Sequence, residues 1–226
     1  MNSRTATIDR VPDLGTQIAK ALKSAILLGY LTFDVTLTQS NLCERVKMSR
    51  MPVRDVLARL TDQGLIGGAE QGLLHPIALS PDDITDLFRV EAQLASLAAR
   101  SATERATEGD LARIRELHTR MTKAVLEEDM ATAAASNRLF HREINLAARA
   151  LMLVSALRTT FVHVHREFLM EFPQCVRHSL TEHEAILAAL ERRTASKVAT
   201  LMPRRVEHSG EEVARGLAQS RSEKPY

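Results

Sequence analysis

Residues 49–64 read Ser-Arg-Met-Pro-Val-Arg-Asp-Val-Leu-Ala-Arg-Leu-Thr-Asp-Gln-Gly and decide the fold class of the N-terminal third. Ser49 is a favoured helix N-cap, and Gly64 is a favoured residue at a helix end. One helical face between them is apolar and consists of Val53, Val56, Leu57 and Leu60. The other face is basic and carries Arg50, Arg54 and Arg59. The stretch therefore predicts an amphipathic helix with an arginine-bearing outer face.

The segments around this helix complete a small domain. Residues 14–28 repeat apolar side chains at spacings of three and four and predict a helix that ends at Gly29. Thr38 is suited to N-cap a second helix of about two turns. Residues 65–79 place glycines between apolar residues and predict two short strands joined by a turn. Three helices and a small hairpin are the layout of a winged helix-turn-helix, which we assign to residues 12–79.

The rest of the chain predicts a helical bundle. Ser80 and Pro81, followed by two aspartates, form a helix-start pattern that marks the domain boundary. From there the sequence predicts about six helices, over 81–103, 108–127, 129–147, 150–171, 179–192 and 195–219. We therefore expect a mainly α protein in which residues 80–219 form an all-helical effector-binding and dimerisation domain.

The composition excludes several protein classes. The chain has 226 residues, 45% of them hydrophobic and 26% charged, so it is suited to packed domains and not to disorder. Its longest apolar stretches fall well short of the roughly 20 residues that a membrane span needs. The N-terminus lacks the apolar run of a secretion signal, and Cys43 and Cys175 show neither metal nor redox spacing. We expect a cytoplasmic protein with no membrane partner.

The net charge of +2 is small, but its distribution points to the N-terminal third. Residues 1–79 contain 9 Lys and Arg against 7 Asp and Glu, whereas the remainder contains 21 of each kind. A helix in the DNA major groove needs long donors near its N-terminus, because guanine presents two acceptors there. Arg50 and Arg54 lie four residues apart and suit that role. An arginine-bearing helix taken alone is more often simply solvated, so its context decides.

Further residues near the helix start are suited to DNA phosphates. Ser49 and the backbone N–H groups of the first turn form an anion site at the helix N-terminus. Arg45 and Lys47 lie in the turn between the two helices, where they suit the phosphate backbone. These residues, together with Arg50 and Arg54, are the candidate DNA-binding set.

The stretch from Gln39 to Leu79 resembles the N-terminal domain of the GntR family of bacterial transcription regulators. The resemblance rests on Leu42-Cys-Glu-Arg-Val-Lys-Met-Ser-Arg-Met-Pro-Val-Arg-Asp-Val-Leu-Ala-Arg-Leu-Thr-Asp-Gln-Gly-Leu-Ile66. The family pattern there is Ser-Arg-x-Pro-Val-Arg-x-x-Leu, then a leucine, then Gly-Leu. The resemblance implies that Arg50 and Arg54 reach the bases and phosphates of DNA.

The wing departs from that family pattern. It reads Glu70-Gln-Gly-Leu-Leu-His75 where the family usually has Gly-Arg-Gly. Gly72 is placed for the turn, and Gln71 or His75 would touch the minor groove. Ser40 lies where some relatives have another DNA-contacting arginine. The resemblance therefore adds Gly72 to the DNA-binding set.

Histidines mark the C-terminal region. Asn137 and His141 lie four residues apart on one helical face, and His183 and His208 follow. Imidazoles that converge from different helices are a good ligand set for a divalent metal such as Zn or Ni. A lone histidine on a helix face is more often structural, so spacing alone is weak support.

Residues 82 to about 208 resemble the all-helical FCD effector domain of the FadR branch of GntR regulators. The matching segments are Asn137-Arg-Leu-Phe-His141, Glu182-His-Glu-Ala-Ile-Leu-Ala-Ala-Leu190 and Ala199-Thr-Leu-Met202. Metal-binding relatives use an aspartate and three histidines. His141 and His183 match, whereas Asn137 stands in place of the aspartate and Arg205 in place of the third histidine.

Two interpretations of these residues stay open. Asn137, His141 and His183 form a reduced metal site, with His208 as a substitute third histidine. Alternatively, Arg205 binds the carboxylate of a small effector directly, with Asn137, His141 and His183 as hydrogen-bond partners.

Other positions in the C-terminal region affect these two interpretations. Glu91 and Ala95 stand where the family usually has an arginine and a glutamate. His163, His165 and Arg166 are expected to line the same cavity, and His118 and His178 to lie at the surface.

Together these features predict a dimeric, ligand-responsive transcription regulator that binds a palindromic DNA operator, most often as a repressor. The alternative is a metal-dependent enzyme that uses the histidine cluster. The sequence has no His-Glu-x-x-His segment and no glycine-rich phosphate loop, and Asn137 cannot act as a proton-transferring carboxylate. A helical interaction module without DNA binding is opposed by Arg50, Arg54 and the wing pattern. We therefore expect a regulator and not an enzyme.

Overall fold

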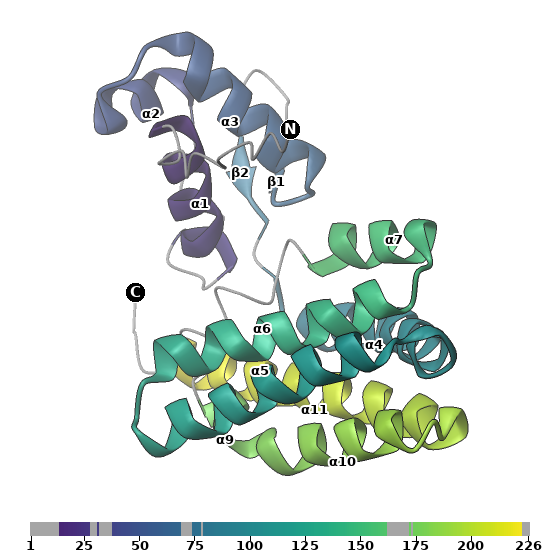
Figure 1. The fold of residues 1–226 in the computed structure, drawn as a ribbon. Coiled ribbons are helices and arrows are strands. Elements are labelled where there is room, and N and C mark those ends of the chain that lie inside the picture. The colour runs from purple at the N-terminus through teal and green to yellow at the C-terminus, as the bar shows by residue number, and fades with distance from the viewer. Residues whose placement is uncertain are drawn as a thin grey trace, which may run out of the picture. The chain divides into compact units, whose positions relative to one another are not determined.

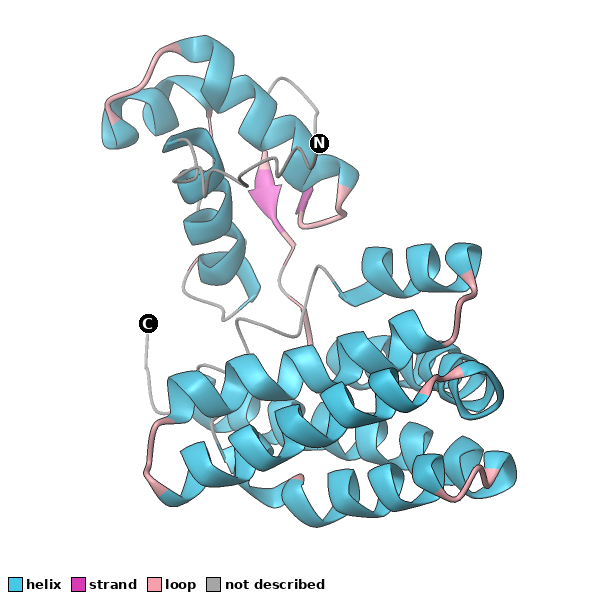
Figure 2. Ribbon diagram, viewed as in Figure 1, coloured by secondary structure: helices cyan, strands magenta, loops and turns pink. Residues whose placement is uncertain are grey.

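The chain divides into two compact units, Met1–Ala78 and Leu79–Tyr226. The computed structural model describes residues 14–27, 31, 38–68, 74–77, 79–161, 172 and 174–222. Helices dominate both units, and the strands among the described residues belong to the first (Figures 1 and 2). The predicted mainly α fold is confirmed.

The first unit is a helix-turn-helix with a small sheet. It contains α1 (Leu14–Leu27), α2 (Gln39–Val46), α3 (Arg50–Asp62), β1 (Ile66–Gly67) and β2 (His75–Pro76). The strands are antiparallel, with Ile66 opposite Pro76. The core comes from the predicted apolar face of α3 and its neighbours, namely Ile26, Leu27, Leu42, Val53, Val56, Leu57, Leu60, Leu65 and Ile66. Gly72 and the predicted wing turn lie outside the described residues.

Local chemistry sets the ends of α2 and α3. The Thr38 side chain accepts a hydrogen bond from the Asn41 N–H and caps α2. Gly64 ends α3 with a φ of +67°, which glycine adopts without steric cost. The Leu65 N–H then bonds back to the Leu60 carbonyl at 2.9 Å, which is the helix-ending pattern that such a glycine permits.

The second unit is an all-helical bundle. Its helices are α4 (Pro81–Arg105), α5 (Glu108–Leu126), α6 (Met130–Ala147), α7 (Leu151–Phe161), α9 (Gln174–His178), α10 (Leu180–Glu191) and α11 (Ala195–Ser222). The predicted helix over 150–171 is described only as far as Phe161, and residues 162–171 lie outside the described residues. The five-residue α9 was not predicted, because it is too short to show a helical period.

Helices α4 and α11 pack closely because small residues line their contact. The buried face of α4 contains Ala92, Ala95, Ala98, Ala99 and Ala102. On α11, a Cβ added at Gly210 would lie only 2.5 Å from the Phe88 Cβ. Pro203 lies inside α11 and has no N–H to offer the Ala199 carbonyl one turn earlier. The Ser96 hydroxyl of α4 donates to that carbonyl at 2.9 Å, so the lost helical bond is replaced across the interface.

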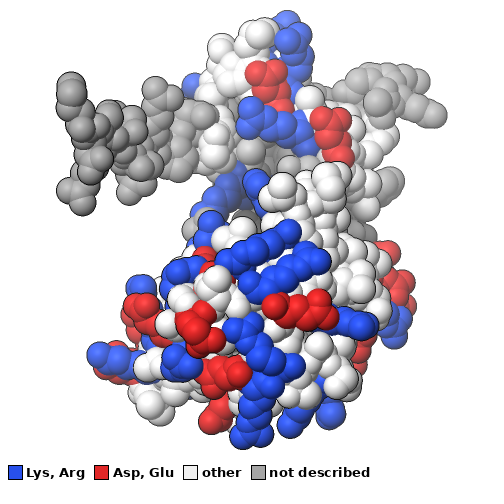
Figure 3. All heavy atoms as spheres, turned by 45° about the vertical axis from the view of Figure 1, so that its right-hand side comes forward, with Lys and Arg blue, Asp and Glu red and all other residues white. Residues whose placement is uncertain are grey.

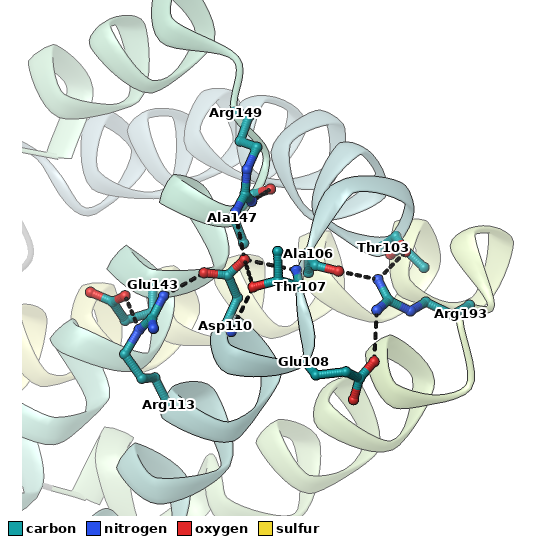
Figure 4. A network of polar contacts seen from close by, with 10 residues as sticks. All are labelled: Thr103, Ala106, Thr107, Glu108, Asp110, Arg113, Glu143, Ala147, Arg149 and Arg193. Atoms are coloured by element: carbon teal, nitrogen blue, oxygen red, sulfur yellow. Dashed lines mark hydrogen bonds and ion pairs between the residues drawn. The ribbon is translucent and has the colours of Figure 1, made fainter.

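A polar network ties the corner between α4 and α5 to the ends of α6 and α10 (Figure 4). Asp110 accepts hydrogen bonds from the Thr107 N–H at 2.8 Å and from Arg149 at 2.8 Å, and it also pairs with Arg113. Arg193 donates to the carbonyls of Thr103 and Ala106 at 3.1 and 2.7 Å. Two arginines that follow helix ends thus bind the backbone and carboxylate of one corner.

Replacing Asp110 by asparagine is expected to lower the free energy of unfolding by about 2–4 kcal/mol near neutral pH. The Thr107 backbone hydrogen bond, followed by Arg149, holds the pKa of Asp110 well below its ordinary value, although burial opposes this shift. Because the pKa is depressed in the folded state, this stabilisation is present above about pH 4 and is lost as the pH falls further. Urea unfolding of both proteins should show a difference that narrows in acid.

Asp86→Asn is the matched control for that experiment. The Asp86 carboxylate pairs with Arg89 at 2.9 Å, but both side chains are well exposed. Loss of such a surface pair changes stability little. A gap between wild type and Asp110→Asn that stays constant from neutral to acid pH would show that the ionised network does not stabilise the fold.

Candidate functional site

The start of α3 is held in place by α2. The Gln39 side chain, at the start of α2, donates to the Arg50 carbonyl at 2.7 Å. Ser49 is the N-cap of α3 and has extended backbone angles, but its side chain makes no capping hydrogen bond. The Ser49 hydroxyl and the first N–H groups of α3 are therefore presented together at a helix N-terminus, a geometry that suits an anion.

The candidate DNA-binding residues lie on the outer side of this helix pair. Arg45, Lys47, Ser49, Arg50 and Arg54 are all exposed. Lys47 has a φ of +52° at the end of α2, which turns the chain toward α3. Within the described residues neither Arg50 nor Arg54 forms an ion pair, and Arg54 contacts only the Met51 sulfur at 3.4 Å. Both guanidinium groups thus keep their donors for an external acceptor.

The second unit shows a different distribution of charge. On the face turned to the viewer in Figure 3, the Lys and Arg side chains of this unit are interspersed with Asp and Glu. Many of its arginines are paired with carboxylates, among them Arg113, Arg115, Arg149 and Arg193. This pairing agrees with the balance of 21 basic and 21 acidic residues counted beyond residue 79.

Two predicted effector residues meet inside the bundle. His141 on α6 and His183 on α10 are buried, and their Nε2 atoms lie 3.1 Å apart, so one ring donates to the other. The Phe140 ring lies 4.7 Å from the His183 ring and perpendicular to that of His141. The Ser179 hydroxyl, which donates to the Val176 carbonyl, lies 3.4 Å from His183 Nδ1.

Asn137 lies one turn before His141 and is completely buried. Neither its amide nitrogen nor its amide oxygen has a hydrogen-bond partner among the described residues. A buried amide without partners is costly, because it loses its bonds to water. The Asn137 side chain is therefore suited to a small polar molecule or water within the bundle.

Arg205 on α11 is held by a separate set of residues. Its guanidinium donates to the Cys175 carbonyl at 3.3 Å, and its Nε lies 3.6 Å from a Glu182 carboxylate oxygen. Burial lowers the pKa of Arg205, and the nearby Glu182, Glu212 and Glu91 oppose that change. Burial also raises the pKa of Glu91 on α4 well above its ordinary value, although Arg205 acts against the rise. Arg205 is therefore a buried cation beside several carboxyl groups.

A cavity of about 330 Å³ opens beside Arg205. It lies between α9, α10 and α11 and is lined by His178, Thr181, Glu182, Arg205, His208, Glu211, Glu212 and Arg215. His208 contacts Glu182 at 2.7 Å, and His178 contacts Glu212 at 2.5 Å. Burial, together with the nearby Glu212, raises the pKa of the Cys175 thiol to about 12, so this thiol stays protonated at neutral pH.

The residues of the predicted metal set do not fit a divalent ion. Arg205 is a permanent cation in the place of the third imidazole, and Asn137 offers only a neutral amide. His208 is engaged with Glu182. No group of three or more His, Cys, Asp or Glu within the described ranges is placed to hold a metal ion. We therefore derive no role for Zn or Ni.

Several residues of this region were missed by the sequence analysis. Glu182 and Glu212 both lie near Arg205. Glu182 on α10 contacts His208 on α11, and Glu212 on α11 contacts His178 on α9. These contacts between helices leave no local sequence signal. Glu91 was noted only as a departure from the family pattern, and a buried glutamate on an alanine-rich face was the available signal. His118 was expected at the surface but is half-buried, with its ring 6.2 Å from that of Phe140, whereas His178 is exposed as expected. His163, His165 and Arg166 lie outside the described residues.

None of the helices in the described part of the chain is both long and apolar enough to cross a membrane.

Comparison with known proteins identifies relatives of both units. HTH-type transcriptional regulator McbR of Escherichia coli (strain K12) is 26% identical over 182 residues, which cover 79% of this chain and 82% of McbR. The solved structure of E. coli McbR/YncC covers 93% of this chain and 100% of its own, with a TM-score of 0.67 and 23% identity. The Lar regulator of Listeria monocytogenes covers 93% of this chain and 99% of its own, with a TM-score of 0.63 and 17% identity.

Two family patterns account for most of the sequence. Residues 14–72 match the bacterial regulatory proteins of the gntR family, and residues 86–208 match the FCD domain. The relatives and both patterns are those of transcriptional regulators, and nothing in them supports the alternative of a metal-dependent enzyme. The chain therefore belongs to the GntR family of transcriptional regulators and carries an FCD domain after its DNA-binding helix-turn-helix.

Proposed function

We propose that this protein binds a palindromic DNA operator as a cytoplasmic homodimer and represses transcription until a small carboxylate effector binds its FCD domain. The observation that carries the proposal is that Arg50 and Arg54 are exposed in the first turns of α3 and form no ion pair within the described part of the chain. Arg50 and Arg54 lie four residues apart on one face of α3, and each guanidinium group can donate two hydrogen bonds to the two major-groove acceptors of a guanine.

The remaining candidates position α3 on the DNA backbone. Ser49 and the first N–H groups of α3 bind one phosphate, aided by the helix dipole. Arg45 and Lys47 bind neighbouring phosphates from the end of α2. These contacts set the register, and Arg50 and Arg54 read the sequence.

The effector acts through the second unit. Arg205 binds its carboxylate. Asn137, His141 and His183 are not among the residues that line the cavity beside Arg205, so we assign them no contact with that carboxylate. An effector that binds the two arrangements of the DNA-binding heads unequally changes operator affinity, with a coupling on the order of 1–3 kcal/mol. Arg205 is buried and carries a donor, Nε, with no hydrogen-bond partner among the described residues, which supports its role as an anchor.

Exposed apolar side chains on α4 and α7 support the homodimer. Val90 and Leu97 lie on the outer side of α4, and Leu151 and Met152 begin α7, which packs against α4. Exposed apolar patches mark protein–protein interfaces, and we assign these side chains to the dimer interface. A dimer would place two α3 helices on half-sites about one DNA turn apart.

Replacing Leu97 by glutamate is expected to convert the dimer to a monomer, because each interface would then bury two added carboxylates. Light scattering coupled to size exclusion should give about twice the 25.1 kDa chain mass for the wild type and the single-chain mass for the variant. Leu126→Glu is the matched control, since Leu126 is at least as exposed (79% against 56% for Leu97) but lies at the end of α5. A monomeric wild type, or a dimeric Leu97→Glu protein, contradicts this interface.

In vitro transcription tests the direction of regulation. The template has the operator, found by selection from a random DNA pool, overlapping its promoter. The amount of transcript should fall as wild-type protein is added. Arg50→Ala/Arg54→Ala protein should leave the transcript unchanged. An increase of transcript with wild type would show activation, and no change with either protein would contradict regulation through this operator.

A further inference from the structure

The cavity beside Arg205 is lined by charges of both signs. It contains two arginines, Arg205 and Arg215, and three glutamates, Glu182, Glu211 and Glu212. Its volume of about 330 Å³ is at the small end of the range for ligand sites, so it suits a compact molecule.

Arg205 lines the cavity and has a donor that lacks an acceptor among the described residues. Arg205 is only 2% exposed, and its Nε has no hydrogen-bond partner within the described residues. The Glu182 oxygen nearest to Nε is 3.6 Å away, which is too long for a good hydrogen bond. A buried cationic donor without a bond is costly, and a ligand carboxylate would satisfy it.

The walls of the cavity disfavour a simple anion. Glu182 and Glu212 line the cavity together with Arg205. Oε1 of Glu182 contacts His208, and Oε1 of Glu212 contacts His178. Apart from the two histidines, the lining holds three carboxylates against two guanidinium groups. A ligand that bears only a carboxylate would meet this excess, whereas a ligand with an adjacent ammonium group would complement it.

We propose that the cavity between α9, α10 and α11 binds a zwitterion of the α-amino acid class. Arg205 receives the carboxylate, and the wall carboxylates of Glu182 and Glu212 receive the ammonium group. This proposal rests on the proposed function only in that it takes the bound molecule to be the effector. It narrows the class of effector from carboxylates to carboxylates that also have an ammonium group.

Matched sets of small molecules test the proposal on the full-length protein. Each standard α-amino acid is compared with the carboxylic acid that lacks its amine and with the amine that lacks its carboxylate, for example L-alanine, propionate and ethylamine. Binding is followed by the shift in the unfolding midpoint and by calorimetry. At least one amino acid should raise the midpoint, and its two counterparts should bind about tenfold or more weakly.

Two variants assign the binding to this cavity. Glu182→Gln should remove the preference for the amino acid over its deaminated counterpart while leaving the protein folded. Glu207→Gln changes a neighbouring carboxylate on α11 that lines a different cavity, and it should keep the wild-type affinity. Equal binding of the carboxylic acid and the amino acid, no shift with any amino acid, or an unchanged preference in Glu182→Gln would overturn the proposal.

These readouts do not involve DNA. If the protein binds an amino acid but selects no operator, the proposed function is wrong and the proposed amino acid site is still supported. Operator selection by a protein that binds no amino acid would refute this site alone.

Discussion

Alanine in place of Arg54 is expected to abolish sequence-specific DNA binding while leaving the fold intact. The Arg54 side chain is exposed and its helix is held by the buried face opposite, so its removal does not disturb the core. A bidentate arginine–guanine contact is worth about 1–3 kcal/mol, and a dimer uses the residue twice. Operator affinity should fall by about 2–6 kcal/mol, or roughly 30-fold to over 10,000-fold, in fluorescence anisotropy titrations.

Arg59→Ala is the matched control for Arg54→Ala. Arg59 is an exposed arginine on the same helix, but it lies in the last turn of α3. The variant loses the same charge, so it should weaken binding to all sequences modestly and keep the preference for the operator. Retention of full operator preference by Arg54→Ala would reject α3 as the recognition helix.

Replacing Gly210 by alanine is expected to destabilise the second unit, although alanine is the better helix former. The added Cβ would lie 2.5 Å from the Phe88 Cβ and 2.7 Å from its Cγ, so α4 and α11 must move apart. Overpacking of a core typically costs about 1–3 kcal/mol and exceeds the gain of about 1 kcal/mol in helix propensity. We expect a net loss of about 1–2 kcal/mol and a melting temperature lower by roughly 2–8 °C.

Gly109→Ala is the control for Gly210→Ala, and we do not expect it to lower the melting temperature. Gly109 lies in the first turn of α5, and the atoms nearest to an added Cβ are 3.7 Å away, at ordinary contact distance. This variant should keep or slightly raise the melting temperature. A melting temperature raised in both variants would show that α4 and α11 do not pack as closely as described.

Local sequence signals predicted the DNA-binding unit because its elements are set by neighbouring residues. The N-cap Ser49 and the αL residue Gly64 bound α3, and the apolar period places its core face. The start of α4 was predicted for the same reason, since Ser80 and Asp83 form a reciprocal capping box.

The effector region was less predictable because its contacts join residues far apart in sequence. His141 and His183 were paired by family resemblance, and the structure brings their rings together. The position of Arg205 between Cys175 and Glu182 depends on how α11 packs on α9 and α10, which no local pattern encodes. For the same reason the cavity that these helices form could not be anticipated from the sequence.

Selection from a random DNA pool at about physiological salt tests the central claim most directly, because nonspecific binding fades steeply with salt. Wild-type protein and Arg50→Ala/Arg54→Ala protein are run in parallel, each with and without the amino acid set. The wild type should enrich one palindrome with half-sites about 10 base pairs apart, and the double variant should enrich none. Equal enrichment of the same palindrome by both proteins, or no enrichment by the wild type under either condition, would contradict the account.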